Sequence, residues 1–464
     1  MDSHNAYSPP NIAIIGGGIV GMILAAGLHR RSIPVAVYEA ASSFRESGAG
    51  IGFNPAAKAC MLMIDPAVLT ALRLCGGVSV SGAALDEFHD YLRWVDGYSR
   101  DDDVALEQVE LAPGGWQKLY LKADAGYKGI EGTRRDHFLD QLAELLPSDS
   151  IHFNKQLDTL NDPEDGSRIT LTFADGTSAT ADAVIGCDGI RSKVREFIVA
   201  PGSAPCHPTY THVCSYRALL PMTSAIEALG PATATVYHNH IGPGANVIHY
   251  PVASNTLVNV AIFLHDANEW PDVSSWTTRD ASRSDLDVAL QHWNPRIRKL
   301  IQLLPERLPM LAVFDMYDHP LARYDHGRVC VAGDAAHASS PHHGAGAGMG
   351  IEDALCLCTL LAEVSSTDQD DESAVAVKLA AALRTYDRVR RGRSQWLVNS
   401  SRRVCELQHN SDFGDASRRV RAETCFEEIL DRTFKIWKFD PMAMVRDAAE
   451  RYRGECSSWC LDHV

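Results

Sequence analysis

The pattern of apolar and polar positions is clearest near the start of the chain. A short apolar run at 12–15 leads into three glycines at 16–18, and a helix-forming stretch at 22–28 follows. A second run rich in β-branched residues, at 35–38, comes next. Short apolar runs on either side of a helical stretch are typical of buried parallel strands joined by a crossover helix. The pattern therefore predicts a strand, a turn, a helix and a strand.

The glycines of this turn have a functional spacing. Gly16, Gly18 and Gly21 fill the three glycine positions of G-x-G-x-x-G. These positions allow a tight turn, close approach of the backbone to a pyrophosphate, and close packing of helix on strand. The helix N-terminus would offer N–H groups to the phosphates. Glu39 ends the second strand, where an acidic residue hydrogen-bonds a ribose hydroxyl. We predict a dinucleotide site; the alternative is a glycine turn in an ordinary βαβ unit.

The pattern further along the chain predicts a second domain within the first. Residues 132–146 have the apolar spacing of an amphipathic helix, and strand-like runs fill 151–185. From 206 to 320, strand-like runs between Pro and Gly turns predict an antiparallel sheet. An amphipathic helix is predicted at 286–304.

The pattern of the first domain returns after Gly327. An apolar run at 329–332 leads into Gly333 and Asp334, then a loop of small residues, and then a helix that begins near Gly348. A long helix is predicted at 374–406. Its arginines are interpreted mainly as a solvated helix face that is partly paired with the surplus of acidic residues: Arg384, Arg388, Arg390, Arg391 and Arg393.

The predicted fold class is α/β, in part α+β. A Rossmann-like dinucleotide-binding domain is interrupted by an antiparallel-sheet domain, and a helical region ends the chain. The predicted segments are the dinucleotide-binding parts 1–83, 126–205 and 321–365, the sheet parts 84–125 and 206–320, and the helical region 366–464.

Composition narrows the possible partners. The net charge is −16, from 43 basic and 59 acidic residues, and no block of basic residues is long enough to follow a phosphate backbone. Nucleic acid is therefore not an expected partner.

The first ten residues lack the features of a signal peptide, and no run of apolar residues is long enough for a membrane span. The 12 cysteines are scattered, as in reduced core thiols. We expect a cytoplasmic protein that does not bind a membrane.

Three motifs stand in order along the chain: GGGIVG, CDGIRSKVR and VAGDAAHASSPHHGAGAG. Together they resemble the single-component flavin-dependent aromatic hydroxylases, with the fold of p-hydroxybenzoate and salicylate hydroxylases. Further segments, among them DYLRWVDGY, HYPVA and CFEEILDRTFKIWKFD, are similar to fungal monooxygenases of polyketide pathways. Those enzymes dearomatise phenols on the way to tropolones, azaphilones and sorbicillinoids. The resemblance extends from Asn11 to about Tyr452.

The resemblance implies a role for particular residues in FAD binding. Gly16, Gly18 and Gly21 would bind the pyrophosphate, and Glu39 the adenosine ribose. Arg135 would contact the flavin chain, and Asp334 the ribityl chain. Independently of the resemblance, the segment 42–58 is rich in Gly and Ser and directly follows Glu39, so it can run beside the cofactor with Arg45 available to a phosphate or ribose. The other implied cofactor contacts are Arg45, Gly52, Asp188, Pro341, Gly344, Gly346 and Ala347. For Arg45, a solvated loop position is an equal alternative.

The resemblance also implies the chemistry. Reduced FAD and O2 would give a flavin C4a-hydroperoxide, whose distal oxygen is attacked by an electron-rich ring carbon. NADPH or NADH would bind transiently and reduce the flavin, which agrees with the lack of a second glycine fingerprint. Asp188 and Gly189 form the motif that this family associates with both FAD and NADPH.

A phenolate is a much better nucleophile than a phenol, so the site needs a fixed positive charge or strong donors. In the dearomatising enzymes these are an arginine and a tyrosine, and they match Arg217 in SYRALL and Tyr250 in VIHYPVA. Each has an alternative: Arg217 could pair with a core carboxylate, and Tyr250 could be a packed tyrosine with its hydroxyl at the surface.

Three histidines close in sequence, His337, His342 and His343, suggest a metal site. The glycines among them suit a loop that packs on a flavin better than a rigid metal site, so no metal is predicted. His342 or His343 could instead shape the flavin site.

The sequence therefore predicts an FAD-dependent, NAD(P)H-consuming monooxygenase. Its expected substrate is a small phenolic polyketide, with dearomatisation to a hydroxylated dienone favoured. The alternatives are an ordinary salicylate-type hydroxylase, a flavin oxidase or halogenase on the same scaffold, and a flavoprotein without catalytic function. The expected oligomeric state is monomer or homodimer.

Overall fold

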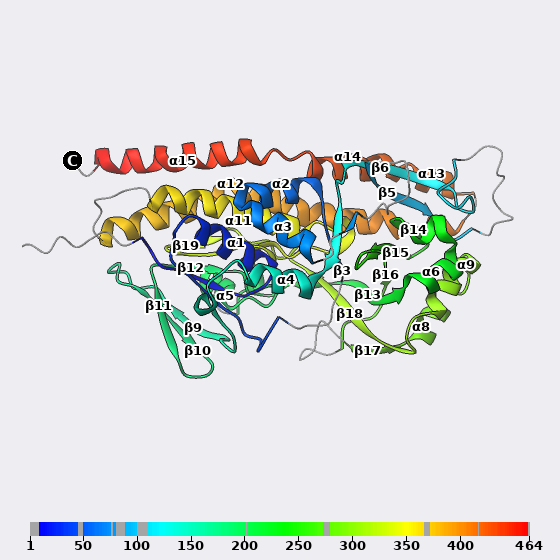
Figure 1. Cartoon of the computed structure of the whole chain (residues 1–464), viewed down its shortest axis with the longest axis horizontal. Coiled ribbons are helices and arrows are strands. Elements are labelled where there is room, and N and C mark those ends of the chain that lie inside the picture. Colours follow the sequence, from blue (N-terminus) through cyan, green and yellow to red (C-terminus); the bar gives the residue numbers. More distant parts are fainter. Residues whose placement is uncertain are drawn as a thin grey trace, which may run out of the picture.

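The computed structural model describes residues 9–44, 50–75, 78–79, 89–99, 110–200, 202–271, 279–365, 372–415 and 417–462. Two large sheets lie one after the other along the long axis of the molecule. The long helix α12 (Glu372–Gln408) runs beside both sheets (Figure 1). Helix α15 (Pro441–Asp462) packs against α12 and α11 and lies over the half that contains the N-terminal strands. This arrangement confirms the predicted fold class.

The first sheet contains the predicted dinucleotide-binding strands. It has six strands, and every adjacent pair is parallel except β19 with β20. All four residues of β1 and of β12 are buried, which explains their continuous apolar runs. The strands in spatial order are β19 (Asp325–His326), β20 (Val329–Val331), β12 (Ala183–Gly186), β1 (Ile12–Ile15), β2 (Val35–Tyr38) and β8 (Ile151–His152).

Helices cover this sheet and form the larger core with it. Helix α1 packs on α11, and α11 packs in turn on α2, α12 and α15. The covering helices are α1 (Ile19–Arg30), α2 (Pro55–Ile64), α3 (Pro66–Leu74), α4 (Arg135–Ala143), α5 (Lys193–Val199) and α11 (Gly346–Ser365). A separate antiparallel sheet projects beside it, formed by β9 (Leu157–Asn161), β10 (Ile169–Phe173) and β11 (Ser178–Ala181).

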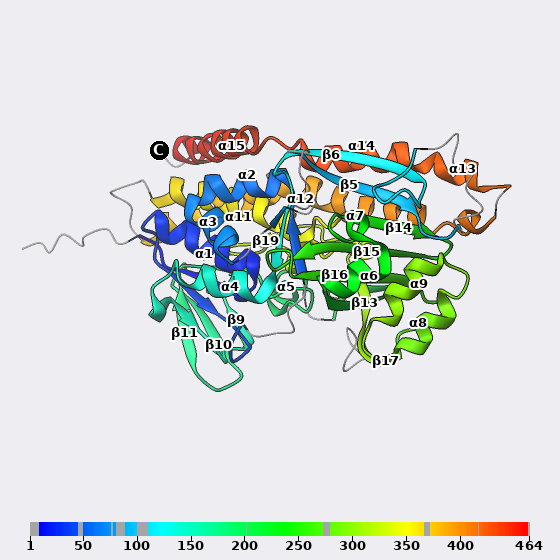
Figure 2. The ribbon, with the colours of Figure 1, turned by 45° about the vertical axis from the view of Figure 1, so that its right-hand side comes forward.

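The second large sheet has eight strands, and all adjacent pairs are antiparallel except β14 with β5. Strands β5 and β6 come from a distant part of the chain and form one edge of this sheet, where α14 (Cys425–Trp437) lies alongside them (Figure 2). The order is β17 (Arg279–Ser282), β18 (Arg307–Asp315), β13 (Thr209–Pro221), β16 (Leu257–His265), β15 (Ala245–Val252), β14 (His238–Gly242), β5 (His89–Asp96) and β6 (Leu119–Tyr127).

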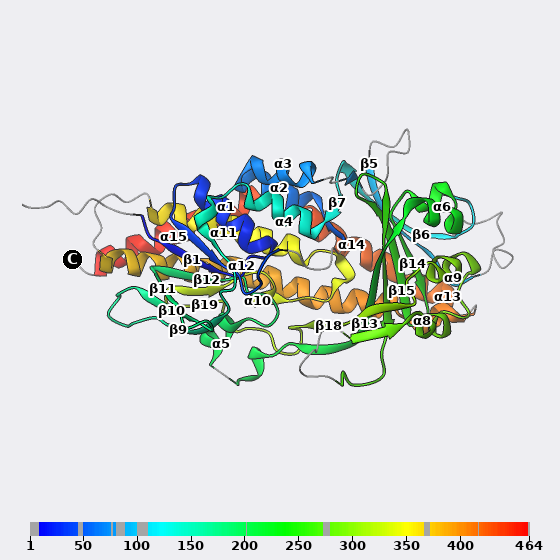
Figure 3. The same cartoon turned by 60° about the horizontal axis from the view of Figure 1, so that its bottom comes forward.

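One face of the eight-stranded sheet packs on short helices and forms a second core. These helices are α6 (Met222–Leu229), α7 (Pro231–Ala234), α8 (Arg283–Ala289) and α9 (Pro295–Gln302). A small sheet of β3 (Gly50–Phe53), β7 (Glu131–Arg134) and β4 (Val78–Ser79) packs on β15 of the eight-stranded sheet and on α4. The chain also forms α10 (Asp334–His337), the 3-10 turn η4 (Pro341–His343) and α13 (Arg419–Glu423). Figure 3 shows α12 running along the long axis of the molecule past both halves.

Two local predictions were wrong, and a third holds only in part. The helix predicted at 286–304 is two helices, because Asn294 caps a new helix by accepting a hydrogen bond from the Arg296 N–H, and Pro295 starts it. The helix predicted at 132–146 begins only at Arg135, since the residues before it pair as β7. The arginines of α12 are a solvated face only in part: Arg384 and Arg388 are exposed and pair with Glu455, as expected, whereas Arg390 is buried.

Some predictions lie outside the described residues. Arg45 is one, and residues 46–49 of the segment expected beside the cofactor are others. All cysteines whose side chains the structure describes are free thiols, as expected. No helix among the described residues combines the length and the apolar character needed to cross a membrane. The boundaries of the six predicted segments stay predictions.

Candidate active site

Two adjoining cavities lie where the sheets meet. The first has a volume of 490 Å³ and runs along the carboxyl ends of β1, β2 and β12. The second has a volume of 340 Å³ and lies against the eight-stranded sheet. The residues that line both are Ile51, Arg135, Asp334, Gly346 and Ala347. A ligand that is longer than either cavity could therefore occupy both.

The three fingerprint glycines differ in their surroundings. Gly16 has a φ of +104°, and a Cβ there would lie 2.4 Å from the carbonyl oxygen of Cys187. A Cβ on Gly21 would lie 2.1 Å from the carbonyl oxygen of Gly16, so helix and turn pack too closely for a side chain. A Cβ on Gly18 would meet nothing within 4 Å, because this glycine faces the cavity at the N-terminus of α1.

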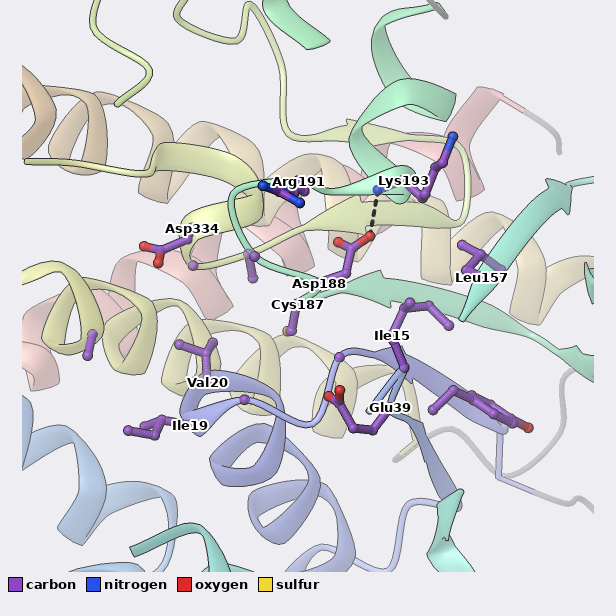
Figure 4. A pocket seen from close by; sticks show the side chains of 18 of the residues that line it. Ile15, Ile19, Val20, Glu39, Leu157, Cys187, Asp188, Arg191, Lys193 and Asp334 are labelled. Atoms are coloured by element: carbon purple, nitrogen blue, oxygen red, sulfur yellow. Dashed lines mark hydrogen bonds between the residues drawn. The ribbon is translucent and has the colours of Figure 1, made fainter. Parts of the chain in front are cut away.

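Glu39 lies beside the glycine turn, at the end of β2 (Figure 4). Its carboxylate accepts hydrogen bonds from the backbone N–H of Gly17 at 2.6 Å and of Ala41 at 2.8 Å. These bonds fix the carboxylate at the cavity wall. A carboxylate oxygen has two lone pairs, so the group can still accept a bond from a ribose hydroxyl.

Asp188 lines the same cavity but is bonded within its own loop. It accepts a hydrogen bond from the Lys193 N–H at 2.7 Å (Figure 4). It also accepts one from the Ser192 hydroxyl at 2.5 Å. Burial raises the pKa of this carboxyl, and the hydrogen bonds from Ser192 and the backbone oppose that effect. The carboxyl therefore holds the turn that carries Gly189 and Arg191 to the cavity wall.

Arg135 and Asp334 lie where the two cavities meet. Arg135 is the first residue of α4, and Asp334 follows β20 as the first residue of α10. Burial raises the pKa of Asp334, while the positive charge of Arg135 opposes the rise. The turn before Asp334 requires glycine, since Gly333 has a φ of +61°.

The loop after α10 forms one wall of the second cavity. Pro341 and Gly344 line the second cavity only, and Gly344 has the left-handed φ of +58° that ends the turn η4. Gly346 and Ala347 begin α11 and line both cavities. Gly52, in β3, lines the second cavity.

Arg217 and Tyr250 both line the second cavity. Arg217 belongs to β13 and pairs with Ala261 of β16. Tyr250 belongs to β15, on the other side of β16, and pairs with Asn259 of that strand. Among the described residues, no carboxylate lies within ion-pair distance of Arg217, and its buried Nε has no hydrogen-bond partner. The predicted alternative, a salt bridge in the core, is therefore not found in the described part of the chain.

Burial raises the pKa of the Tyr250 hydroxyl to about 12, and the nearby positive charge of Arg217 opposes the rise. The ring of Tyr250 stacks on Tyr237 with a centroid distance of 6.1 Å. Tyr250 therefore lies at the cavity, near Arg217, rather than with its hydroxyl at the outer surface.

The sequence did not identify the other walls of the second cavity. They come from β5, β16 and α14, and from a residue before β14. Strand-like and helical patterns predicted these elements but could not show which face would meet a ligand. The missed residues are Leu92, Trp94, Tyr237, Asn259, Phe263, Thr433 and Trp437.

The three histidines near Asp334 have separate surroundings. His337 is bonded to Asp353 through Nε2 at 2.5 Å, and His343 to the Ser400 hydroxyl at 2.9 Å. His342 lies near Cys405 and His409. Each of these three side chains offers one atom that could bind a metal, and the three atoms lie within 4.8 Å of one another. Burial lowers the pKa of His409 to about 4 and raises that of the Cys405 thiol to about 12. The absence of a metal stays a prediction.

A buried ion network supports this loop from behind. Asp353 accepts hydrogen bonds from the Gly333 N–H at 3.1 Å and from Arg390 Nε at 2.8 Å. Glu352 pairs with Arg390 at 2.8 Å and with Arg393 at 2.7 Å. These contacts tie α11 and α12 to the turn that presents Asp334.

The polar groups and the free space of the first cavity fit a dinucleotide such as FAD. Gly18 leaves open space at the N-terminus of α1, where a Cβ would otherwise project, and the carboxylate of Glu39 is fixed beside it. The second cavity continues past Arg135 and Asp334 and can take the ring end of such a cofactor and a small molecule beside it.

Known proteins similar to this chain agree with that fit. The family model described as an FAD binding domain matches residues 119–401. The chain is 48% identical to the FAD-dependent monooxygenase eupB of Phoma sp. over 446 residues, which cover 94% of this chain and 97% of that protein. It is 47% identical to the salicylate hydroxylase asL1 of Sarocladium schorii over 468 residues, covering 97% of this chain and 94% of that protein. A solved salicylate hydroxylase substrate complex is similar with a TM-score of 0.75 at 26% identity, covering 95% of this chain and 98% of that one.

Proposed function

The chain belongs to the FAD-dependent monooxygenases of the salicylate hydroxylase family, and we propose that it hydroxylates a polyketide-derived phenol with loss of aromaticity. NADPH or NADH would supply the electrons and O2 the oxygen atom. The observation that carries the proposal is Arg217, which lies at the second cavity with no carboxylate partner among the described residues.

FAD would extend through both cavities. In this proposal Gly16, Gly18 and Gly21 hold the pyrophosphate at the N-terminus of α1, and Glu39 accepts a hydrogen bond from the adenosine ribose. The remaining contacts would come from Gly52, Arg135, Asp188, Asp334, Pro341, Gly344, Gly346 and Ala347. When bound and reduced, FAD supplies the activated oxygen taken from O2.

Arg217 would bind the substrate as a phenolate. A guanidinium within about 4–6 Å lowers the pKa of an acidic group by about 1–3 units, which raises the phenolate fraction near neutral pH. Tyr250 stays protonated because burial raises its pKa, so its hydroxyl can donate a hydrogen bond to the same oxygen. Charge on that oxygen increases electron density at the ring carbons ortho and para to it.

The aromatic and apolar walls would hold the ring and exclude water. Trp94, Tyr237 and Phe263 line the cavity with Trp437, and stacking on such side chains orients a flat substrate. Whether the product is an ordinary phenol or a dienone depends on the carbon that receives oxygen. If that carbon bears an alkyl group, no proton can leave, so the ring stays dearomatised.

Two other flavin chemistries differ in a testable way. Halogenases on this scaffold typically need a lysine beside the flavin, and no lysine is among the described residues that line the second cavity. That observation favours oxygenation over halogenation. A flavin oxidase would consume NADPH and release peroxide without adding oxygen to the phenol.

The test is the variant Arg217→Ala, compared with Arg217→Lys. If Arg217 binds the phenolate, the alanine variant should keep FAD but lose turnover by about 100-fold, a loss typical of a missing oxyanion donor. Lysine keeps the charge and should recover part of the activity. Normal turnover in the alanine variant would remove Arg217 from the mechanism.

A further inference from the structure

Three side chains of the types that bind metals meet beside the second cavity. His342 belongs to the turn η4, Cys405 belongs to α12, and His409 directly follows α12. One possible ligand atom from each lies within 4.8 Å of the other two. His342 lines the second cavity, whereas Cys405 and His409 do not. The cluster therefore joins the wall of this cavity to the C-terminal end of α12.

The spacing of the two residues from α12 suits a single metal ion. The His409 N–H donates to the carbonyl oxygen of Cys405 at 2.9 Å, so the helical turn continues as far as His409. Side chains at positions i and i+4 lie on the same face of a helix. The Cys405 sulfur lies 3.8 Å from Nδ1 of His409. A thiolate sulfur and an imidazole nitrogen are both ligands that Zn²⁺ prefers in proteins.

The hydrogen bonds of His409 leave its Nδ1 for a metal. Nε2 of His409 lies 2.8 Å from the side-chain oxygen of Asn246. An amide oxygen can only accept, so Nε2 carries the proton of the neutral ring and Nδ1 has a free lone pair. Asn246 is itself oriented by Asn239, whose side-chain oxygen accepts a hydrogen bond from the Asn246 amide at 2.8 Å. A metal-binding histidine typically donates its second ring N–H to an oxygen in this way.

His342 also has one nitrogen left for a metal. Its Nδ1 lies 3.2 Å from the Ser340 hydroxyl oxygen, to which it can donate a hydrogen bond. Its Nε2 is buried and has no partner among the described residues. A buried nitrogen without a partner is unfavourable, and a bound ion would satisfy it.

The cluster is shielded from solvent but can be reached by an ion. His342 and Cys405 are each only 7% exposed, whereas His409 is half-buried and offers a path of entry. The positive charge of Arg402 acts on both His342 and Cys405. Arg402 is paired with Asp315 at 2.6 Å, so its repulsion of a cation is offset.

We propose that His342, Cys405 and His409 bind one Zn²⁺ ion, which fastens the loop after α10 to the C-terminal end of α12. Cys405 would bind as a thiolate, and its proton would pass to solvent. Three protein ligands leave a fourth position for water. This set differs from the three loop histidines for which no metal is predicted, because His337 and His343 are bonded elsewhere. The proposal does not depend on the substrate or on the reaction.

The first test is zinc binding by the FAD-loaded, oxidised enzyme, measured by equilibrium dialysis against ZnCl2 and metal analysis. The wild type should retain one Zn²⁺ per chain. Cys405→Ser and His409→Gln should each bind it at least about 100-fold more weakly, because a lost ligand costs more than the 10–100-fold of a lost outer partner. Cys425→Ser is the control, since this half-buried thiol lies in α14, outside the cluster, and it should bind zinc like the wild type.

Thermal unfolding gives a second readout that does not involve catalysis. An ion that binds the folded state alone raises the melting temperature as its concentration increases. ZnCl2 should therefore raise the melting temperature of the wild type and of Cys425→Ser, but not that of Cys405→Ser. An equal rise in Cys405→Ser would overturn the proposal.

X-ray absorption at the zinc edge identifies the ligands in the wild type alone, so it does not depend on the folding of any variant. The spectrum should show one sulfur at about 2.3 Å and nitrogen at about 2.0–2.1 Å. Zinc surrounded only by nitrogen and oxygen would be adventitious and would overturn the proposal. Failure of the wild type to retain zinc would overturn it as well. Either result would leave the proposed function standing.

Discussion

His337 Nε2 lies 2.5 Å from a carboxylate oxygen of Asp353, and both side chains are buried. The same carboxylate accepts hydrogen bonds from Arg390 and from the N–H of Gly333. Burial acts to raise the pKa of Asp353, but His337 and Arg390 outweigh it and hold that pKa well below its usual range. The charged carboxylate thus supports the turn that carries Asp334.

Replacing Asp353 should therefore damage both stability and cofactor binding. In Asp353→Ala the buried Arg390 charge keeps Glu352 as its one ion-pair partner among the described residues, and this change should lower the free energy of unfolding by about 3 kcal/mol. FAD should bind more weakly because the Gly333 turn loses its acceptor. Thermal unfolding and FAD titration by flavin fluorescence measure the two effects.

Asp447→Ala is the control, since Asp447 forms only an exposed pair with Arg451 among the described residues. Unchanged FAD affinity in Asp353→Ala would contradict a supporting role for this carboxylate.

The fingerprint glycines should respond differently to substitution. Gly21→Ala places a Cβ 2.1 Å from the Gly16 carbonyl oxygen, so it should lower the melting temperature even without FAD. Gly18→Ala meets nothing within 4 Å and should leave the melting temperature of the FAD-free protein unchanged. It should still weaken FAD binding, because the methyl group projects where the cofactor would lie. Equal FAD affinity in Gly18→Ala and the wild type would argue against this placement of the pyrophosphate.

Most of the fold could be predicted because its signals are local. The runs at 12–15 and 35–38 are apolar throughout, and the glycines between them have a fixed spacing. The break before Pro295 was missed because the apolar period continues across it, although Asn294 and Pro295 together are a helix-start signal.

The site was only partly predictable, because its other walls depend on tertiary packing. Trp437 comes from the C-terminal region, and no periodicity shows that α14 would reach the second cavity. Arg390 was misinterpreted for the same reason, since a helix with arginines on several faces does not reveal which face meets Glu352 and Asp353.

Buried neutral histidines should make the protein sensitive to acid. Burial lowers the pKa of His249 to about 4, and His409 has a similar value. In the unfolded chain the pKa of a histidine is about 6.5. Between pH 6.5 and about 4 the unfolded state therefore binds more protons. Stability is fully present above pH 6.5 and is lost as the pH falls, by about 1.4 kcal/mol per pH unit for each such histidine.

Melting temperatures measured from pH 8 to pH 5 test this expectation. The variant His249→Gln removes one buried titrating group, so its melting temperature should fall less steeply with decreasing pH than that of the wild type. His29→Gln is the control, because His29 is exposed. Identical pH profiles for His249→Gln and the wild type would show that His249 does not contribute to acid sensitivity.

The most direct test of the central claim is NADPH oxidation by the purified, FAD-loaded enzyme with a ring-methylated formyl resorcinol. The reaction is followed by the mass and the absorbance of the product. The account predicts substrate-dependent oxidation, a gain of one oxygen atom and loss of the aromatic chromophore. A gain of one oxygen with the aromatic ring intact would identify an ordinary phenol hydroxylase. Peroxide as the only product across a panel of such phenols would contradict the proposed hydroxylation.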